Sequence, residues 1–262
     1  MLLVLVITRR RVLMKRLEMF VVGSLMLVLS LSLHADVREA YICNYADGKD
    51  MGDLMSARDF YVKEAEKAGL EPATAFVWTP VKAGGDRVPD VLWFNNYEDE
   101  IAFAKQSDAF AASAPMEKVN ERFNSVMNCN SAIASREVVY SSGEVTGSNP
   151  PAIIVSTACM VHPDVSAENL EDLWGHVRGV LGSIDAYKNH LLYRTTPTTS
   201  GRNSPDLRLY SVNSNMTDWA SKRAAFQASE ATPQLMRHFQ STLDCNTSLW
   251  TGQRVVPVGN TE

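Results

Sequence analysis

Residues 42–61 read ICNYADGKDMGDLMSARDFY, in which a cysteine closes an apolar strand and a helix follows a polar turn. Residues 158–177 read ACMVHPDVSAENLEDLWGHV and show the same order 116 positions later. In both segments apolar residues recur at i, i+3 and i+7, which is typical of the buried face of a helix. Asp50 and Ser166 stand just before these helices, and both residue types are good N-caps. The two segments therefore predict that one structural unit occurs twice in the chain.

The cysteines follow the same repeat. Cys43 and Cys129 are 86 residues apart, and so are Cys159 and Cys245. Placed over each other at the offset of 116, the two halves align without a gap and share several residue types. Examples are Pro89 with Pro205, Asp90 with Asp206, Phe110 with Phe226, and Phe123 with Phe239. A single register across both halves predicts a duplication, with the seam in the Ser/Gly/Pro-rich residues 141–151.

Each half is predicted to run strand, helix, strand, strand, helix, strand. The expected strands are 37–44, 73–79, 88–96 and 132–140 in the first half, and 152–161, 188–196, 205–212 and 248–258 in the second. The expected helices are 51–68 and 99–126, then 166–183 and 217–243. The later helix of each half should break at Pro115 or Pro233, because proline disrupts a helix interior. This βαββαβ order is the ferredoxin-like motif, so we expect an α+β fold with repeat 1 at residues 36–146 and repeat 2 at residues 147–262.

The sheet order of that motif predicts the disulfides. The first and last strands of a ferredoxin-like sheet are antiparallel neighbours, so the end of one lies beside the start of the other. Cys43 is expected near the end of the first strand and Cys129 just before the fourth. Of the three possible pairings, only Cys43–Cys129 with Cys159–Cys245 agrees with both the sheet and the repeat. The alternative is four free, buried thiols.

The N-terminal residues are typical of a signal peptide. Five Lys or Arg between residues 9 and 16 precede the apolar run FVVGSLMLVLSLSL, residues 20–33, and a small residue, Ala35, follows. We expect cleavage after Ala35, so residues 1–35 form the signal peptide and the mature protein is periplasmic or secreted. Such compartments permit disulfides. The run is short for a membrane span, which needs about 20 residues, and retention as a membrane anchor is the alternative.

Charge excludes some partners. The chain carries a net charge of −5, and removing residues 1–35 takes away five Lys/Arg and one Glu, which leaves 20 basic and 29 acidic residues, a net charge of −9. Nucleic acids and anionic lipid surfaces attract cationic proteins, so neither is an expected partner. No second apolar segment approaches membrane-spanning length, so no membrane association is expected after cleavage. The oligomeric state is not determined by the sequence.

Two βαββαβ units in one chain resemble the dimeric α+β barrel superfamily, which includes antibiotic-biosynthesis-monooxygenase-like proteins. The resemblance covers residues 37–258, and the segment CNYADGKDMGDLMSARDFY is also similar to secreted bacterial proteins of unknown function. It implies that the two units pack together as an α+β barrel within one chain. Members include cofactor-independent oxygenases, haem enzymes and proteins without known activity. No catalytic motif of the family is present here, so the resemblance assigns no catalytic residue.

Strand alternation predicts a ligand site inside the barrel. If the cysteines face the helices, the opposite face of the sheet lines the interior. The residues expected to bind a ligand there are His162, Arg194, Arg208, Tyr210, Trp78 and Phe94. At the offset of 116, Trp78 aligns with Arg194 and Phe94 with Tyr210, so one half supplies apolar groups and the other polar groups. In the alternative interpretation the aromatic residues only fill the seam between the sheets, and the arginines pair with acids at the rim.

Motifs for other chemistry are missing from the sequence. Cys159 and His162 are spaced like a metal pair, but Cys159 has a predicted disulfide partner, so no metal site is expected. There is no glycine-rich phosphate loop and no nucleophile elbow, and no cofactor is expected. The sequence therefore predicts an exported cell-envelope protein that binds a small, partly apolar, partly anionic molecule between two sheets. The alternative is an enzyme, either a cofactor-independent monooxygenase or a haem-dependent protein.

Overall fold

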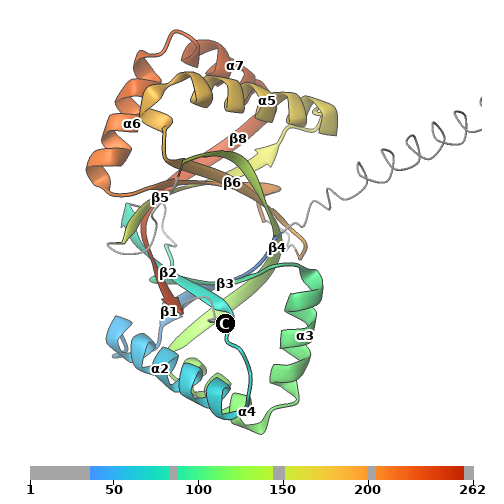
Figure 1. The fold of residues 1–262 in the computed structure, drawn as a ribbon, viewed down its shortest axis with the longest axis vertical. Helices are drawn as coiled ribbons and strands as arrows, with labels where there is room; N and C mark the ends of the chain where they lie inside the picture. The colour runs from blue at the N-terminus through green and yellow to red at the C-terminus, as the bar shows by residue number, and fades with distance from the viewer. Residues whose placement is uncertain (1–35, 83–87, 144–150, 200–203, 257–262) are drawn as a thin grey trace, which may run out of the picture. The chain divides into compact units, whose positions relative to one another are not determined.

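Eight strands close into one barrel, and helices pack against its outer surface (Figure 1). The computed structural model describes residues 36–82, 88–143, 151–199 and 204–256. The predicted signal peptide, residues 1–35, lies outside the described residues, as does most of the predicted seam. The strands are β1 (Asp36–Tyr45), β2 (Thr74–Lys82), β3 (Val91–Tyr97), β4 (Met127–Ser142), β5 (Ala152–Val161), β6 (His190–Pro197), β7 (Leu207–Asn213) and β8 (Leu243–Val256).

Six α-helices occur in the described residues. They are α2 (Met51–Lys67), α3 (Glu100–Ala111), α4 (Ala114–Asn124), α5 (Ala167–Ser183), α6 (Met216–Ala228) and α7 (Thr232–Thr242), with a short 3-10 helix η1 (Asp185–Tyr187). The break expected at Pro115 and at Pro233 is confirmed, since each proline lies in the first turn of a new helix, where a missing N–H costs nothing. The polar residues expected to cap α2 and α5 do so. Asp50 accepts hydrogen bonds from the backbone of Gly52 and Asp53, and Ser166 accepts one from Asn169.

Two long strands close the barrel. The order around it is β1-β3-β2-β8-β5-β7-β6-β4, and all neighbours are antiparallel. Residues 127–136 of β4 pair with β1, and residues 134–142 of the same strand continue along β6. β8 pairs likewise with β5 and then with β2. β4 thus connects β1 with β6, and β8 connects β5 with β2. These two connections join the expected two sheets into a single α+β barrel with no free edge.

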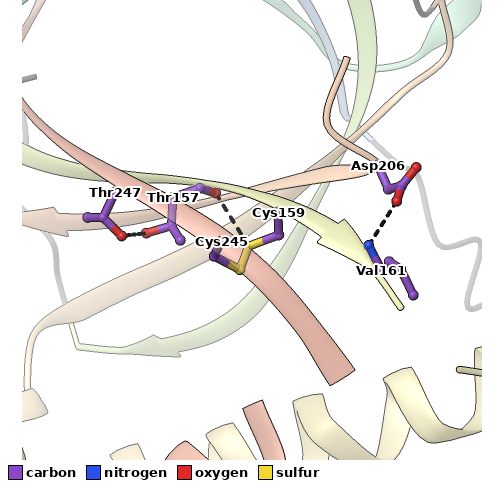
Figure 2. Close-up of a disulfide and its surroundings, with 6 residues drawn as sticks. All are labelled: Thr157, Cys159, Val161, Asp206, Cys245 and Thr247. Atoms are coloured by element: carbon purple, nitrogen blue, oxygen red, sulfur yellow. Dashed lines mark hydrogen bonds between the residues drawn. A yellow bond between two sulfur atoms is a disulfide. The ribbon is translucent and has the colours of Figure 1, made fainter. Parts of the chain in front are cut away.

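Both predicted disulfides are present (Figure 2 shows the second). Cys43 pairs directly opposite Cys129 across β1 and β4, and Cys159 pairs opposite Cys245 across β5 and β8, with 4.1 Å between the Cα atoms in each bond. The expected placement of Cys129 ahead of its strand was wrong, because β4 begins at Met127. Each bond closes a loop with a sequence separation of 86 residues. By chain entropy each stabilises the fold by about 4–5 kcal/mol.

Two aligned aspartates have the same structural role. The carboxylate of Asp90 accepts a hydrogen bond of 2.9 Å from the backbone N–H of Tyr45. That of Asp206 accepts one of 2.8 Å from the backbone N–H of Val161 (Figure 2). Both bonds satisfy a backbone donor at the end of a strand that carries a cysteine, which gives a physical reason for an aspartate at both positions.

The core consists of three clusters. One lies under helices α2 and α4, on first-half strands and the end of β8, and includes the fully buried Leu54 and Met116. A second lies under α5, on second-half strands and part of β4, and includes Leu173 and Trp174. The third fills the barrel interior and is rich in aromatic rings. Cys43 and Cys159 belong to the first two clusters, so the cysteines face the helices as expected.

The described residues, from Asp36 onward, belong to one compact unit. None of the helices in the described ranges is long and apolar enough to cross a membrane.

Candidate functional site

Aromatic side chains meet inside the barrel. The ring of Trp78 lies 4.5 Å from that of Phe94 and 5.2 Å from that of Tyr210, measured between centroids. Tyr210 also lies 5.0 Å from Tyr193. Trp78, Phe94 and Tyr210 therefore share the interior face, as strand alternation predicts, and all three are buried.

Arg194 does not belong to this site, so that expectation was wrong. Its guanidinium donates 2.8 Å hydrogen bonds to the carboxylates of Glu137 and Glu171 on the outer surface, and it lies 5.4 Å from the centroid of the Trp174 ring. The neighbour Tyr193 points into the barrel instead. Arg194 thus does what the alternative interpretation assigned to it, which is to pair with acids.

A shift of one residue explains the error. In the first half Phe76 pairs with Phe94, whereas in the second half Tyr193 pairs with Tyr210. The offset between halves is therefore 117 for β6 (193 minus 76) but 116 for β7 (210 minus 94). One extra residue in the connection from α5 to β6 changes which side chains of β6 face inward, because successive side chains on a strand point to opposite faces.

His162 and Arg208 are not members of the aromatic cluster. His162 follows the end of β5, where its Nδ1 lies 3.2 Å from the backbone oxygen of Ser241. Arg208 shares the inward face of β7 with Tyr210 but is only half-buried, and it makes no ion pair with any residue in the described ranges. Burial raises the pKa of Tyr210, and the positive charges of Arg208 and Arg38 oppose that rise. Arg208 therefore acts on the interior through its charge.

Arg38 is the central polar residue of the interior, and it was missing from the predicted site. Its side chain is only 4% exposed. Nε donates a hydrogen bond of 2.8 Å to Oδ1 of Asn96, and Nη1 donates one of 2.8 Å to the phenol oxygen of Tyr193. The guanidinium also lies over the ring of Phe94, 4.7 Å from its centroid. Strand alternation could have found Arg38, since it lies five positions before Cys43 and so faces away from the helices.

Arg136 lies beside Arg38 and was also missed. It forms an ion pair of 2.7 Å with Asp36, and its guanidinium is 4.7 Å from the centroid of the Tyr193 ring. Burial lowers the pKa of Arg136, and the like charge of Arg38 lowers it further. Its Nε is buried and has no hydrogen-bond partner among the described residues. A buried donor without a partner is costly, so it marks a position where a further acceptor would be favourable.

These groups surround a cavity of about 170 Å³. Its polar wall includes Arg38, Arg136 and Asn96, and its apolar wall includes Phe76, Trp78 and Ile154. Gly252 also lines it, and a Cβ at that position would come within 2.8 Å of the Trp78 ring. No Asp or Glu is among the described lining residues, so the cavity has a cationic side and an apolar side. Such an arrangement is suited to a small molecule that carries one negative charge.

The described residues do not fit a metal centre or a histidine-ligated haem. In the described ranges no group of three or more His, Cys, Asp or Glu could hold a metal ion. None of the four described histidines lines the barrel cavity or the larger cavity beneath α2, α3 and α4. Because haem iron is most often held by such a side chain, the donors around these cavities do not favour haem.

Neither a protein-family model nor a curated protein matches this chain. Several solved structures share its fold. A proposed monooxygenase of Fusobacterium nucleatum matches with a TM-score of 0.55 and 15% identity, over 85% of this chain and 94% of that one. An anthrone oxidase-like protein matches with a TM-score of 0.55 and 12% identity, over 88% and 98%. A proposed chlorite dismutase matches with a TM-score of 0.51 and 11% identity, over 86% and 97%. These neighbours belong to the dimeric α+β barrel superfamily, and at such low identity the likeness shows the fold alone.

Proposed function

We propose that this chain is an exported protein that binds a small molecule, partly anionic and partly apolar, inside its barrel. One observation carries the proposal: Arg38 and Arg136 line a cavity in which no described lining residue is an acid. The site differs from the one expected from the sequence, because the arginines come from β1 and β4 rather than from β6 and β7. Trp78, with Phe94 and Tyr210 packed against it, lines the cavity and stays part of the proposed site.

The energetics of Arg38 favour an anionic ligand. Burying a charged group is costly unless it is paired, and both hydrogen-bond partners of Arg38 among the described residues are neutral. Its contacts with aromatic faces offset part of that cost, at roughly 0.5–2 kcal/mol each. A carboxylate would complete the pairing, since guanidinium groups bind it through two parallel hydrogen bonds. The apolar part of the ligand would lie against Phe76 and Trp78.

The cavity volume limits the ligand. At about 170 Å³ it is smaller than the typical site for a drug-sized molecule, which is roughly 300–1,000 Å³. We therefore expect a short aliphatic or single-ring carboxylate rather than a fused-ring compound.

Calorimetric titration with benzoate tests this function. We expect saturable binding to the wild type and a loss of about tenfold or more in affinity in Arg38→Met, because the charge-assisted hydrogen bonds disappear. Arg194→Met is the matched control: it removes an arginine of β6 that faces outward, so it should leave affinity unchanged. Equal affinity in the two variants, or no saturable binding to the wild type, would contradict the proposal.

Export and duplication are parts of the same proposal. Two disulfides fit an oxidising compartment such as the periplasm or the extracellular space. The shared cysteine spacing and the equivalent bonds of Asp90 and Asp206 support an origin from two tandem ferredoxin-like units. The domain limits at residues 36–146 and 147–262 remain part of this proposal.

The second candidate is a cofactor-independent oxygenase, favoured by the fold shared with a proposed monooxygenase and an anthrone oxidase-like protein. Oxygen uptake in the presence of an anthrone would reveal it, since conversion to the quinone consumes one O₂ and releases one water. The absorption spectrum of the purified protein tests the haem-dependent alternative, for which a Soret band is the signature.

A further inference from the structure

A second, larger cavity lies on the other face of the first-half sheet. It measures about 530 Å³ and lies between strands β1, β3 and β4 and the helices α2, α3 and α4. It shares no lining residue with the barrel cavity. Its volume is within the range of ordinary small-molecule sites. The function proposed above makes no use of it.

Glu39 of β1 is the centre of a polar network in this cavity. One carboxylate oxygen accepts a hydrogen bond of 2.7 Å from the phenol of Tyr41. The other accepts 2.9 Å from Nδ2 of Asn95 and 3.2 Å from the phenol of Tyr97. The indole N–H of Trp93 in turn donates 2.8 Å to Oδ1 of Asn95. Three side chains thus hold the carboxylate in one position, and Trp93 orients one of the three.

Aromatic rings form most of the remaining wall. The six that line the cavity are Tyr41, Tyr61, Trp93, Tyr97, Phe110 and Phe123. Several are in contact, with 5.8 Å between the ring centroids of Tyr61 and Phe110 and 5.5 Å between those of Trp93 and Phe123. The π faces of such rings carry partial negative charge, which attracts cations.

The charge of the cavity follows from its ionisable groups. Glu39 is the only acidic residue among the described lining residues, and no Lys, Arg or His is among them. Burial raises the pKa of Tyr61 to about 12, and it raises the pKa values of Tyr41 and Tyr97, where the negative charge of Glu39 adds to the effect. All three phenols are therefore protonated at neutral pH, so the carboxylate is the one source of full charge in the described wall.

The second half of the chain shows that this network is not needed to pack helices on the sheet. β5 and β7 pair with the same register as β1 and β3, at an offset of 116 in both strands. At that offset Val155 replaces Glu39, Thr157 replaces Tyr41 and Leu209 replaces Trp93. An apolar residue thus stands where the first half has a carboxylate. Phe226 and Phe239 repeat two of the rings, but the carboxylate and the phenol and indole beside it belong to the first half alone.

We propose that this cavity is a second binding site, which takes a small organic ammonium ion. A carboxylate fixed among aromatic faces is the arrangement that recognises alkylated ammonium groups, because Coulomb attraction and cation–π contacts act on the same charge. The phenol oxygens of Tyr41 and Tyr97 add hydrogen-bond acceptors for an ammonium that carries N–H groups. This site takes a cation and the barrel site an anion, and the two cavities share no lining residue.

Choline and its uncharged isostere 3,3-dimethylbutan-1-ol provide the test, by calorimetric titration of the intact protein. We expect choline to bind about tenfold or more tightly than the isostere, since the two differ in charge but hardly in shape. Glu39→Gln should remove that preference, whereas Glu66→Gln, which neutralises an exposed acid on α2, should preserve it. Arg38→Met should also leave choline binding unchanged, which separates this site from the barrel site.

Near-UV circular dichroism verifies that Glu39→Gln keeps the native packing. The comparison of choline with its isostere needs no variant, so it decides the matter even if that substitution prevents folding. Equal affinity for the two compounds, no saturable binding of choline, or unchanged choline affinity in a folded Glu39→Gln protein would each overturn the proposal.

Discussion

The guanidinium of Arg38 donates a hydrogen bond of 2.8 Å to the phenol oxygen of Tyr193, a residue 155 positions later in the chain. The two side chains come from β1 and β6 and meet in the barrel interior. The bond therefore connects the first half of the chain with the second, in addition to the strand pairs that close the barrel. Both groups are buried, so a substitution that removes one of them leaves the other with an unsatisfied hydrogen-bonding group, which destabilises the fold.

Tyr193→Phe removes only the hydroxyl that Arg38 uses. We expect the free energy of unfolding to fall by about 1–3 kcal/mol, because a buried charged donor loses its acceptor. Urea denaturation measures the loss. Tyr187→Phe is the matched control, since the Tyr187 hydroxyl makes no hydrogen bond to any described residue, and a loss of equal size in both variants would show that the bond adds nothing.

Gly252→Ala should destabilise the barrel. A Cβ at this position would lie 2.8 Å from Cδ1 and Nε1 of Trp78 and 3.1 Å from Cγ1 of Ile154. Such overpacking costs typically about 1–3 kcal/mol, and the shifted indole should also weaken benzoate binding. Gly179→Ala in α5 meets no atom within 4 Å and should stabilise the protein by about 0.5–1 kcal/mol. Thermal unfolding measures both effects: the midpoint temperature should fall in Gly252→Ala and rise in Gly179→Ala.

Removal of either disulfide should have nearly the same effect. Both bonds close loops with a separation of 86 residues. Replacing Cys43 and Cys129 together by alanine, or Cys159 and Cys245 together, should therefore lower the free energy of unfolding by about 4 kcal/mol in each case. Urea denaturation measures both losses, and peptide mapping without reductant verifies the pairing. A bond between the two halves in that map would contradict the register of the barrel.

His190 should make the protein less stable in acid. Its side chain is 1% exposed, and burial, helped by the positive charge of Lys222 and opposed by Asp218, lowers its pKa to about 4. In the unfolded chain the pKa is about 6.5. Between those values the unfolded state binds the proton and the native state does not, so the free energy of unfolding falls as the pH drops from about 6.5 to about 4, by up to about 3 kcal/mol.

Above pH 6.5 the effect of His190 is absent, and below pH 4 it is constant. His190→Gln cannot titrate, so urea denaturation across this range should give a flatter pH dependence in the variant than in the wild type. Identical slopes for both proteins would show that the native state accommodates the charged imidazole.

Processing should produce a mature chain that begins at or near Asp36. Intact-mass measurement of protein exported by a bacterial host verifies the cleavage. A mass that still includes residues 20–33 would mean that the apolar run is kept as an anchor.

Several of the sequence predictions follow from strand alternation and cysteine spacing. The pairs Cys43–Cys129 and Cys159–Cys245 follow from the repeat spacing and the strand order of the motif. The caps Asp50 and Ser166 and the inward positions of Trp78, Phe94 and Tyr210 follow from local rules. Such rules work where each side chain's position depends on its own strand or helix. Arg38 obeys the same alternation and could have been found by extending the rule along β1 to its beginning.

Only the tertiary structure decided which residues share a site. Arg194 was placed on the wrong face because the alignment contains no sign of the one-residue shift in β6, and a shift of one residue reverses the facing of a whole strand. Arg38, Tyr193 and Arg136 come from three strands that are neighbours only because β4 extends past β1 to pair with β6. The sequence by itself determined the repeating elements, their faces and their cross-links, since these depend on short-range periodicity and spacing. The barrel cavity and its charges depend on how the two halves close into one barrel, and the cavity beneath the helices depends on how α2, α3 and α4 pack on the sheet.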